Sequence, residues 1–434
     1  MYTYTKLKGG YFMLKIGVIG AGNRGKDVYA NFILKNSDEA EIVAVAEPNP
    51  VKRDQMIKAH GILPEYVFNT WEDFLEKDRF CDAIILATGD DMHFEPMELA
   101  MKKGYDILLE KPMSNKAEEC IKIVKMAEKY GVKVMVCHVL RYTPFFSKLK
   151  ELIDSGVIGE VVDIQHNENI GNFHFAHSFV RGNWRNSDET SPLILQKSCH
   201  DLDILSWLLN GNPCKKIASF GNLKHFRKEN APEGAADRCL DCKHIDNCIY
   251  SPKKIYYNNI GVWPTLVASE IQTEEALTKS LEHNQYGRCV YKCDNNVVDN
   301  MVSIIEFENG VNVTFNLCAF TDEVCRTIKI MGTKGEIRGN DEKNHIEVYE
   351  FGKGDGRFAN GRKTEIIPDV LEGGHGGGDT GLMNDFINLC LGRQEDSRTN
   401  PRTSLESHIM AFAAEDSRVN GNVVYMDEYL NRFN

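Results

Sequence analysis

The chain has 434 residues, and its 51 lysines and arginines against 63 aspartates and glutamates give a formal net charge of -12 at pH 7. A hydrophobic fraction of 42% and a charged fraction of 26% are typical of globular proteins and exclude a disordered, collagen-like or coiled-coil chain. The acidic balance argues against nucleic acid or an anionic membrane as the main partner, and no apolar run reaches the roughly 18 residues of a membrane span.

The length predicts two or three domains. Residues 1–12 lack the apolar core and cleavage site of a signal peptide, so we interpret them as an extension before a fold that begins at Met13. We therefore expect a cytoplasmic protein. Because the cytosol keeps thiols reduced, the 13 cysteines argue for a metal or redox site rather than for disulfides.

The first part of the chain alternates short β-branched runs with longer amphipathic stretches. We expect strands at 14–19, 41–46, 66–68, 83–87, 106–109 and 132–136, and helices at 26–34, 51–60, 71–77, 95–103 and 116–129. Strands that are apolar on both faces and separated by helices predict a parallel sheet covered on both sides. Residues 13–145 are thus expected to form a doubly wound α/β domain of the Rossmann type.

Residues 146–434 have a different texture, typical of an α+β domain with a mostly antiparallel open sheet. We expect strands at 160–166, 302–307, 311–315 and 327–330, and helices at 200–209, 382–390 and 404–418. Residues 224–295 contain several cysteines and little periodicity, and we interpret them as an insertion.

A glycine-rich motif, Gly20-Ala21-Gly22-Asn23-Arg24-Gly25, follows the first strand and opens a helix. In this G-x-G-x-x-G pattern the first glycine allows a tight turn, the second lets the backbone approach a pyrophosphate, and the third permits close helix–strand packing. Glu47, at the end of the second strand, is placed to bind ribose hydroxyls. Its carboxylate would repel a 2′-phosphate, so NAD is favoured over NADP, although Lys52 and Arg53 lie nearby.

Two further motifs follow later strands of the same sheet: Thr88-Gly89-Asp90-Asp91-Met92-His93 and Glu110-Lys111-Pro112. Together with the glycine motif, they resemble the glucose–fructose oxidoreductase, inositol dehydrogenase and MocA family of sugar and polyol dehydrogenases. The resemblance covers nearly the whole chain and is weakest over residues 224–278. It implies that residues 13–145 bind NAD and that residues 146–434 bind substrate and form the oligomer contact. The cofactor-binding residues that it implies, with those of the glycine motif, are Gly20, Gly22, Asn23, Arg24, Gly25, Glu47, Thr88, His93, Glu110 and Lys111.

The resemblance also implies the catalytic residues. In that family the lysine of Glu-Lys-Pro reaches nicotinamide ribose and substrate hydroxyl, and a histidine on a helix of the second domain is the acid/base; here these are Lys111 and His200. A neutral imidazole can accept the hydroxyl proton when hydride leaves the carbinol carbon. A nearby lysine can stabilise the developing alkoxide.

The chain departs from the family pattern four residues before His200, where inositol dehydrogenases usually have aspartate and this sequence has Gln196. Glutamine can position a hydroxyl but cannot ionise. The next residue, Lys197, is either part of the proton relay, a partner for an anionic substrate, or a surface charge. Asp203 is either the group that orients His200 or a solvated helix charge.

An aromatic and polar stretch, residues 174–185, has the stacking faces and hydrogen-bonding groups that sugars need. His174 and His177 form an H-x-x-H pattern, but no third ligand at zinc spacing lies nearby, so sugar contact or a structural role is favoured over a metal. The substrate-binding residues that we expect are Arg141, Tyr142, His174, His177, Trp184, Arg185, Gln196 and Asp203.

Cys239-Leu240-Asp241-Cys242 is a C-x-x-C pattern, and Cys248 follows it. A structural zinc needs four ligands, and the fourth is a choice among Cys293, Cys289 and His244, with Cys293 the candidate we select. An iron–sulfur cluster and simple reduced thiols are the alternatives to zinc.

These features favour an NAD-dependent sugar or cyclitol dehydrogenase whose partner is a small molecule. An NAD-dependent glycoside hydrolase or isomerase, which oxidises its sugar transiently and retains the cofactor, is the alternative reading. A non-catalytic sugar or nucleotide sensor is a third. An open sheet needs cover on its outer face, so we also expect a homodimer or homotetramer.

Overall fold

The computed structural model describes residues 13–354 and 361–433, so the extension expected at residues 1–12 lies outside the described residues. Contacts divide the chain into two units. The first unit contains the residues up to Thr143 together with Leu371–Leu405, and the second contains Pro144–Val370 and the residues from Glu406. None of the helices in the described ranges combines the length and hydropathy of a membrane span.

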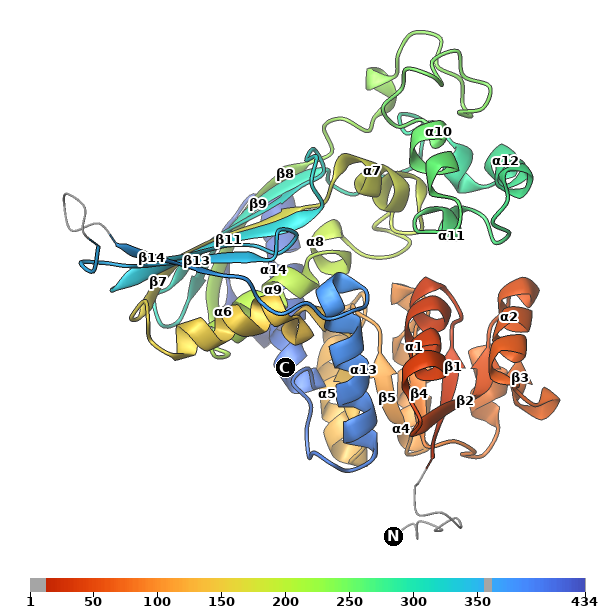
Figure 1. The fold of residues 1–434 in the computed structure, drawn as a ribbon, viewed down its shortest axis with the longest axis horizontal. Helices are drawn as coiled ribbons and strands as arrows, with labels where there is room; N and C mark the ends of the chain where they lie inside the picture. The colour runs from red at the N-terminus through yellow and green to blue at the C-terminus, as the bar shows by residue number, and fades with distance from the viewer. Residues whose placement is uncertain (1–12, 355–360, 434) are drawn as a thin grey trace. The chain divides into compact units, whose positions relative to one another are not determined.

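The first unit is built on a six-stranded parallel sheet with the order β3-β2-β1-β4-β5-β6 (Figure 1). Its strands are β1 (Leu14–Ile19), β2 (Ala40–Ala46), β3 (Val67–Phe68), β4 (Ala83–Leu86), β5 (Asp106–Leu109) and β6 (Val134–Val136). The central strands are buried along almost all of their length, as the apolar runs predict. The doubly wound α/β fold expected for this part of the chain is confirmed.

Helices connect these strands. They are the wide helix Asn23–Ala30 with its continuation α1 (Asn31–Asn36), then α2 (Pro50–His60), α3 (Trp71–Glu76), α4 (Phe94–Lys102) and α5 (Ala117–Tyr130). Local chemistry sets the ends of α2: the Asn49 side chain accepts from two backbone N–H groups of the first turn, Pro50 occupies the first helical position, and Gly61 ends the helix at φ +65°.

The C-terminal segment Leu371–Leu405 packs with the first unit, although the sequence placed it in the second domain. It contains α13 (Gly378–Cys390), which contacts the short turn Val139–Tyr142 after β6. Gly378 permits this approach, because a Cβ there would lie 2.4 Å from the Val139 carbonyl oxygen. A contact between residues so far apart in the chain leaves no mark on local periodicity.

The second unit is built on a nine-stranded sheet with the order β14-β13-β12-β11-β7-β10-β9-β8-β15. Only the β7–β10 pair is parallel, so the mostly antiparallel sheet expected from the sequence is confirmed. Its strands are β7 (Val161–Asn169), β8 (Cys214–Asn222), β9 (Asn300–Phe307), β10 (Asn312–Cys318), β11 (Cys325–Gly332), β12 (Gly335–Asn340), β13 (His345–Glu350), β14 (Arg362–Ile366) and β15 (Val424–Tyr425).

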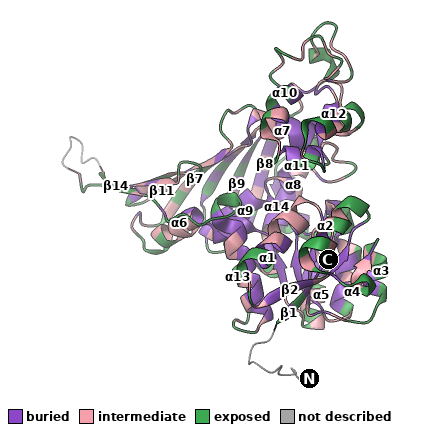
Figure 2. Ribbon diagram, turned by 45° about the vertical axis from the view of Figure 1, so that its right-hand side comes forward, coloured by how far each residue is buried: buried purple, intermediate pink, exposed green. Residues whose placement is uncertain are grey.

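One face of this sheet is covered by helices, among them α6 (Pro144–Asp154) and α9 (Cys199–Leu208), which contact each other (Figure 1). The burial pattern of β9 alternates, and bands of buried and exposed residues run across the sheet (Figure 2). Further helices are α7 (Asn172–Phe175), the wide turn Ala176–Arg181, α8 (Leu193–Gln196), α15 (Met426–Leu430) and α14 (Pro401–Asn420), which crosses the boundary between the units.

The region between β8 and β9 contains only short helices in place of strands. They are α10 (Pro252–Ile255), α11 (Thr265–Ala268) and α12 (Glu274–His283), and they lie together in Figure 1. The low periodicity of this region in the sequence agrees with its short elements. A backbone bridge between Arg238 and Arg288 ties its start to its end.

Candidate functional site

The glycine loop after β1 has the geometry of a phosphate cradle. Gly20 has φ +90°, and a Cβ there would lie 2.5 Å from the carbonyl oxygen of Ala87. A Cβ on Gly25 would lie 2.0 Å from the carbonyl oxygen of Gly20. A Cβ on Gly22, by contrast, would meet no atom within 4 Å. The two outer glycines are therefore required by packing, and the middle one faces open space beside a helix N-terminus, where an anion is favoured.

Glu47 lies beside this loop at the end of β2. Its Oε2 accepts from the backbone N–H of Ala21 at 2.7 Å, and its Oε1 accepts from that of Asn49 at 2.9 Å. The carboxylate is buried, so these two bonds fix it next to the glycine loop. Arg53 donates to the carbonyl oxygens of Glu47 and Pro48, so the guanidinium near this strand end is held by backbone.

Arg24, within the glycine motif, is the centre of a buried ionic network. Its Nε donates to Glu110 Oε1 at 2.7 Å, and its Nη1 and Nη2 donate to the two carboxylate oxygens of Asp379 at 3.2 and 2.7 Å. Tyr29 accepts from Arg24 and donates to Glu110. Two of the predicted cofactor-binding residues, Arg24 and Glu110, thus bind each other, while Asn23 donates to Asp27 at 3.3 Å.

The carboxylates of this network have lowered pKa values. Burial alone would raise the pKa of Asp379, but the charges of Arg24 and His375 hold it well below its usual range. Burial would likewise raise the pKa of Glu110, and the charges of Arg24 and Lys111 lower it. Both groups are therefore ionised at neutral pH and give the region around the glycine loop a fixed charge pattern.

Hydrogen bonds hold the predicted residues that follow β4 and β5. Thr88 donates through Oγ1 to the Met92 carbonyl oxygen at 3.0 Å. His93 is fully buried, and its Nδ1 lies 2.7 Å from the Pro112 carbonyl oxygen, so Nδ1 carries the proton. The Lys111 backbone N–H donates to Glu110 Oε2 at 2.9 Å, and the Lys111 side chain is half-buried. His93 thereby links the segment after β4 to the Glu-Lys-Pro segment.

Arg141 and Tyr142, both predicted to bind substrate, are buried in the first unit. Arg141 donates to the Arg398 carbonyl oxygen at 2.8 Å. The Tyr142 hydroxyl donates to Asp385 on α13 at 2.7 Å. These bonds give both side chains a structural role in holding the C-terminal segment, and their contact with substrate stays a prediction.

In the second unit, α9 places His200 next to a residue that anchors the helix to the sheet. Asp201 is fully buried, and its Oδ1 lies 2.9 Å from Nε2 of His166 on β7 and 2.8 Å from Nε of Arg326 on β11. Burial would raise the pKa of Asp201, but Arg326 and His166 hold it below its usual range. His200 is buried as well, on the helix that these contacts fix.

Lys197 lies between α8 and α9, and its side chain is largely buried rather than a surface charge. Its Nζ is 3.1 Å from Oε1 of the buried Glu168, whose Oε2 binds Arg326 at 2.6 Å. Burial raises the pKa of Glu168, and the charges of Arg326 and Lys197 oppose that rise. One chain of alternating charges thus connects the helix of His200 with the sheet. Its members are Lys197, Glu168, Arg326 and Asp201.

Gln196 and Asp203 lie close to His200 in the sequence, and both are buried. Gln196 donates through Nε2 to the Trp184 carbonyl oxygen at 2.9 Å, which ties α8 to residues 174–185. Burial of Asp203 excludes the solvated helix charge that the sequence left open. Its predicted role beside His200 is retained as a proposal.

The predicted substrate-binding stretch divides into a packed part and a polar part. His177 binds the Tyr256 hydroxyl at 3.0 Å and stacks on Tyr286, and burial with the Arg181 charge lowers its pKa to about 3. His174 packs edge-on against Trp263. Both rings therefore belong to an aromatic cluster, in which His177 is neutral at pH 7.

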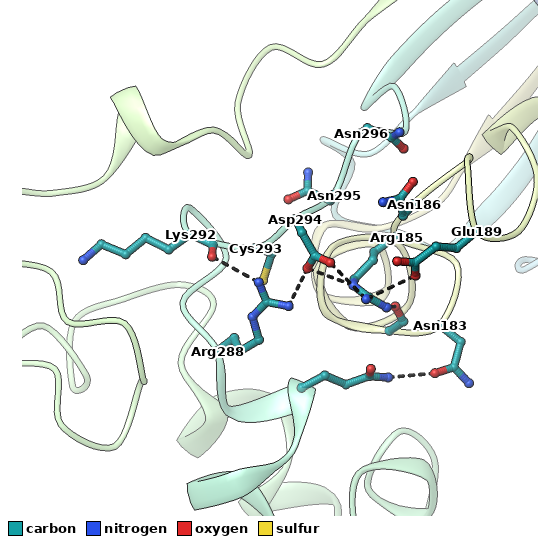
Figure 3. A network of polar contacts seen from close by, with 12 residues as sticks. Asn183, Arg185, Asn186, Glu189, Arg288, Lys292, Cys293, Asp294, Asn295 and Asn296 are labelled. Carbon is teal, nitrogen blue, oxygen red and sulfur yellow. Dashed lines mark hydrogen bonds and ion pairs between the residues drawn. The ribbon is translucent and has the colours of Figure 1, made fainter.

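The polar part of the stretch contains Trp184, which is partly exposed, and Arg185. Arg185 binds Asp294 through two hydrogen bonds of 2.9 and 3.0 Å, and Figure 3 shows Arg288 on the same carboxylate. The hydrogen bond from Arg185 lowers the pKa of Asp294. Arg185 is thus held in an ion-pair network within the second unit.

Three of the four predicted metal ligands, Cys239, Cys242 and Cys248, line one pocket. The fourth thiol in its wall is Cys289, one of the residues that the sequence left open, and Cys293 is not part of the wall. Cys293 instead donates to the Cys289 carbonyl oxygen at 3.3 Å and lies within the network of Figure 3.

Sequence reasoning missed Tyr29, Asp379, Glu168 and Arg326. One signal was present: Ile164, His166 and Glu168 occupy alternate positions of one strand, so two polar groups share a face with a core residue. Asp379 carried no such signal, because it meets Arg24 across 355 positions of the chain.

Comparisons with known proteins place both units in one family. Residues 14–138 match the family GFO_IDH_MocA, the NAD-binding Rossmann fold of an oxidoreductase family, and residues 150–426 match its C-terminal alpha/beta domain. A relative from Bacillus subtilis, "Putative oxidoreductase YteT", is 25% identical over 86% of this chain and 89% of its own length. The 2,7-anhydro-N-acetylneuraminate hydratase of Escherichia coli is 28% identical over 49% of this chain and 54% of its own length.

Solved structures share the fold. The scyllo-inositol dehydrogenase from Lactobacillus casei, crystallised with NAD(H) and scyllo-inositol, has a TM-score of 0.64 at 18% identity. The match covers 96% of this chain and 99% of that one.

Proposed function

The chain belongs to the GFO_IDH_MocA oxidoreductase family, and we propose that it transfers hydride between nicotinamide C4 of NAD and a carbinol carbon of a sugar, sugar derivative or cyclitol. The observation that carries this proposal is the glycine loop, where Gly22 opens onto free space while Gly20 and Gly25 are closed by backbone. These residues fit a dinucleotide pyrophosphate. When bound, the nicotinamide accepts or gives the hydride.

NAD is proposed rather than NADP because of Glu47. Its buried carboxylate is fixed beside the loop, where it suits ribose hydroxyls and repels a 2′-phosphate. Arg53, one of the two cations that would favour a phosphate, is engaged by two carbonyl oxygens. Titration with NADH and NADPH tests this preference, and tighter binding of NADPH would contradict it.

We assign the proton transfer to His200 and the stabilisation of the alkoxide to Lys111. A neutral imidazole accepts the hydroxyl proton as hydride leaves the carbon. A lysine ammonium lowers the energy of the negative oxygen that forms. We propose that Lys197 acts through Glu168. Its ammonium neutralises the buried Glu168 carboxylate and so sets the charge near the helix that contains His200.

A panel of monosaccharides, inositols, sugar acids and disaccharides, each incubated with NAD and followed by NADH absorbance, tests the proposed reaction. We expect NADH formation with at least one polyol. Binding of NADH without turnover of any member would overturn the proposal.

The alternative, an NAD-dependent hydrolase or isomerase with retained cofactor, is distinguished in the same assay. It requires NAD that copurifies with the protein and sugar products that form without net NADH. The hydratase among the relatives keeps this alternative worth testing, because its name describes a reaction without net oxidation.

We also propose a homo-oligomer. The outer face of the second sheet exposes Phe220, Val302 and Ile304, and β8 and β9 place Phe220 opposite Val302. A second copy of this chain would cover this apolar face by a symmetric contact. For the cysteine pocket, we propose an iron–sulfur cluster in place of the zinc ion.

A further inference from the structure

The cysteine pocket in the second unit is a built cavity. It has a volume of about 390 Å³, part of it open to solvent, and Cys239, Cys242, Cys248 and Cys289 all contribute to its wall. Apolar residues fill much of the remaining wall: Pro232, Ala235, Ile245, Pro252 and Val290. Four thiols in an apolar wall suit a metal centre, since thiolates are the protein ligands of zinc and of iron–sulfur clusters.

The backbone explains how four cysteines far apart in the sequence meet. The Cys239 N–H donates to the Gly287 carbonyl oxygen at 2.8 Å, and the Cys289 N–H donates to the Asp237 carbonyl oxygen at 2.9 Å. These two bonds pair the segments around Arg238 and Arg288. Two turns, closed by the N–H groups of Cys242 and Cys248, then bring the remaining thiols to the same wall.

The side chain of Arg181 indicates that this pocket suits a negatively charged group. It is fully buried in the pocket wall, where Nη2 donates to Cys239 Sγ at 3.4 Å and to the Tyr250 carbonyl oxygen at 2.9 Å, and Nε donates to the Arg288 carbonyl oxygen at 2.8 Å. Its Nη1 is buried without a hydrogen-bond acceptor. Among the described residues, none of the contacts of Arg181 is with a carboxylate, and a buried cation in such a place requires an anionic partner.

The spacing of the thiols argues against a single ion. Zinc holds its sulfurs at about 2.3 Å, which brings the four of them within about 4 Å of one another. Among the residues that the structure describes, only His345, Glu347 and Glu365 form a set of three ligands within 4.8 Å of one another. No three of the described pocket thiols therefore lie that close together, and a cluster, in which each sulfur binds a different iron atom, allows a wider spacing than a single ion.

We propose that Cys239, Cys242, Cys248 and Cys289 bind a [4Fe–4S] cluster, with Arg181 donating a hydrogen bond to the sulfur of Cys239. The four thiols release four protons, and the core forms from two ferrous ions, two ferric ions and four inorganic sulfides. A 2+ core with four thiolates has a formal charge of roughly −2, which Arg181 partly offsets. The cluster joins the two ends of a region with few core-forming elements, so its role is structural.

The test uses the full chain, purified without oxygen or reconstituted with ferric iron, sulfide and dithiothreitol, which reduces half of the iron to the ferrous state. We expect about four iron and four acid-labile sulfide per chain. We also expect a broad visible absorbance and an electron paramagnetic resonance signal after reduction with dithionite. About one zinc per chain without labile sulfide, or no metal at all, would overturn the proposal.

Two variants identify the ligands. Cys289→Ser is expected to lose the visible absorbance and most of the iron, whereas Cys293→Ser, four residues on and outside the pocket wall, is expected to retain both. Binding of NADH by each variant reports on the first unit, and circular dichroism reports on the fold. Loss of the cluster in Cys293→Ser with retention in folded Cys289→Ser would overturn the ligand assignment.

Discussion

Lys111 and His200 are single residues on which the proposed chemistry depends, and Lys111 offers the cleaner test. Its backbone N–H is bonded to Glu110, and this bond survives truncation of the side chain. We expect Lys111→Ala to lower turnover by about 10²–10⁴-fold, because an ammonium that stabilises an alkoxide is lost. Affinity for NADH should stay within about tenfold.

Steady-state kinetics and NADH titration check this prediction. Lys116→Ala is the matched control, since Lys116 is an exposed lysine five residues on that pairs with Glu119. Unchanged turnover in Lys111→Ala would refute the assigned role.

Asp379 is the residue that only the folded chain brings to the glycine loop. Asp379→Asn leaves the partly buried Arg24 with one carboxylate partner, and we expect a loss of about 1–3 kcal/mol in the free energy of unfolding at pH 7. Because the pKa of Asp379 is lowered in the folded state, its stabilisation is complete above the unfolded pKa of about 3.9 and disappears as the pH falls.

Thermal unfolding of wild type and Asp379→Asn at pH 7 and below pH 4 checks this. The difference in Tm should be large at pH 7 and shrink in acid. Glu395→Gln, an exposed carboxylate in the same segment, should have little effect at either pH. A difference in Tm that grows in acid would contradict the ion-pair account.

At the scale of elements, Arg326 connects two strands and a helix. It binds Glu168 on β7 and Asp201 on α9 from its own place on β11. Arg326→Lys keeps the charge but loses the planar fork that reaches both carboxylates. We expect a loss of about 2–4 kcal/mol, because one buried carboxylate loses its guanidinium partner and keeps only Lys197 or His166.

Denaturant unfolding of the full chain, followed by circular dichroism, measures this loss. Arg338→Lys on the neighbouring strand β12 is the control, because Arg338 is half-exposed in its pair with Glu336. Its effect should be below about 1 kcal/mol. Equal effects of the two substitutions would refute the anchoring role of Arg326.

At the scale of the whole molecule, the exposed apolar face of the second sheet predicts self-association. Ile304 is 53% exposed on β9, with Phe220 and Val302 on the same face. We expect Ile304→Lys to shift the protein to a lower molecular mass, because a charge in an apolar contact must lose its hydration.

Size-exclusion chromatography with light scattering checks the mass. Ile367→Lys provides a control, since Ile367 is exposed but lies outside the strands of that sheet. A monomeric wild type would contradict the proposed oligomer.

The sequence by itself determined the parallel sheet and the glycine loop. The strands of the first unit are short apolar runs, and the three glycines lie within one strand–turn–helix segment, so both signals are local in the sequence. Strands β8, β12, β13, β14 and β15 were not predicted. β14 is exposed along most of its length, so it is held by backbone pairing to β13 rather than by an apolar face.

Only the tertiary structure decided the partners of the charged residues. Arg24 finds Asp379, Lys197 finds Glu168, and Cys289 replaces Cys293 beside Cys239 because folding brings together groups separated by tens to hundreds of residues. Burial then selects these pairs, since a charge or thiolate removed from water needs a partner in the same place. Local sequence patterns determine the secondary structure. The ion pairs of this protein arise from contacts between distant segments.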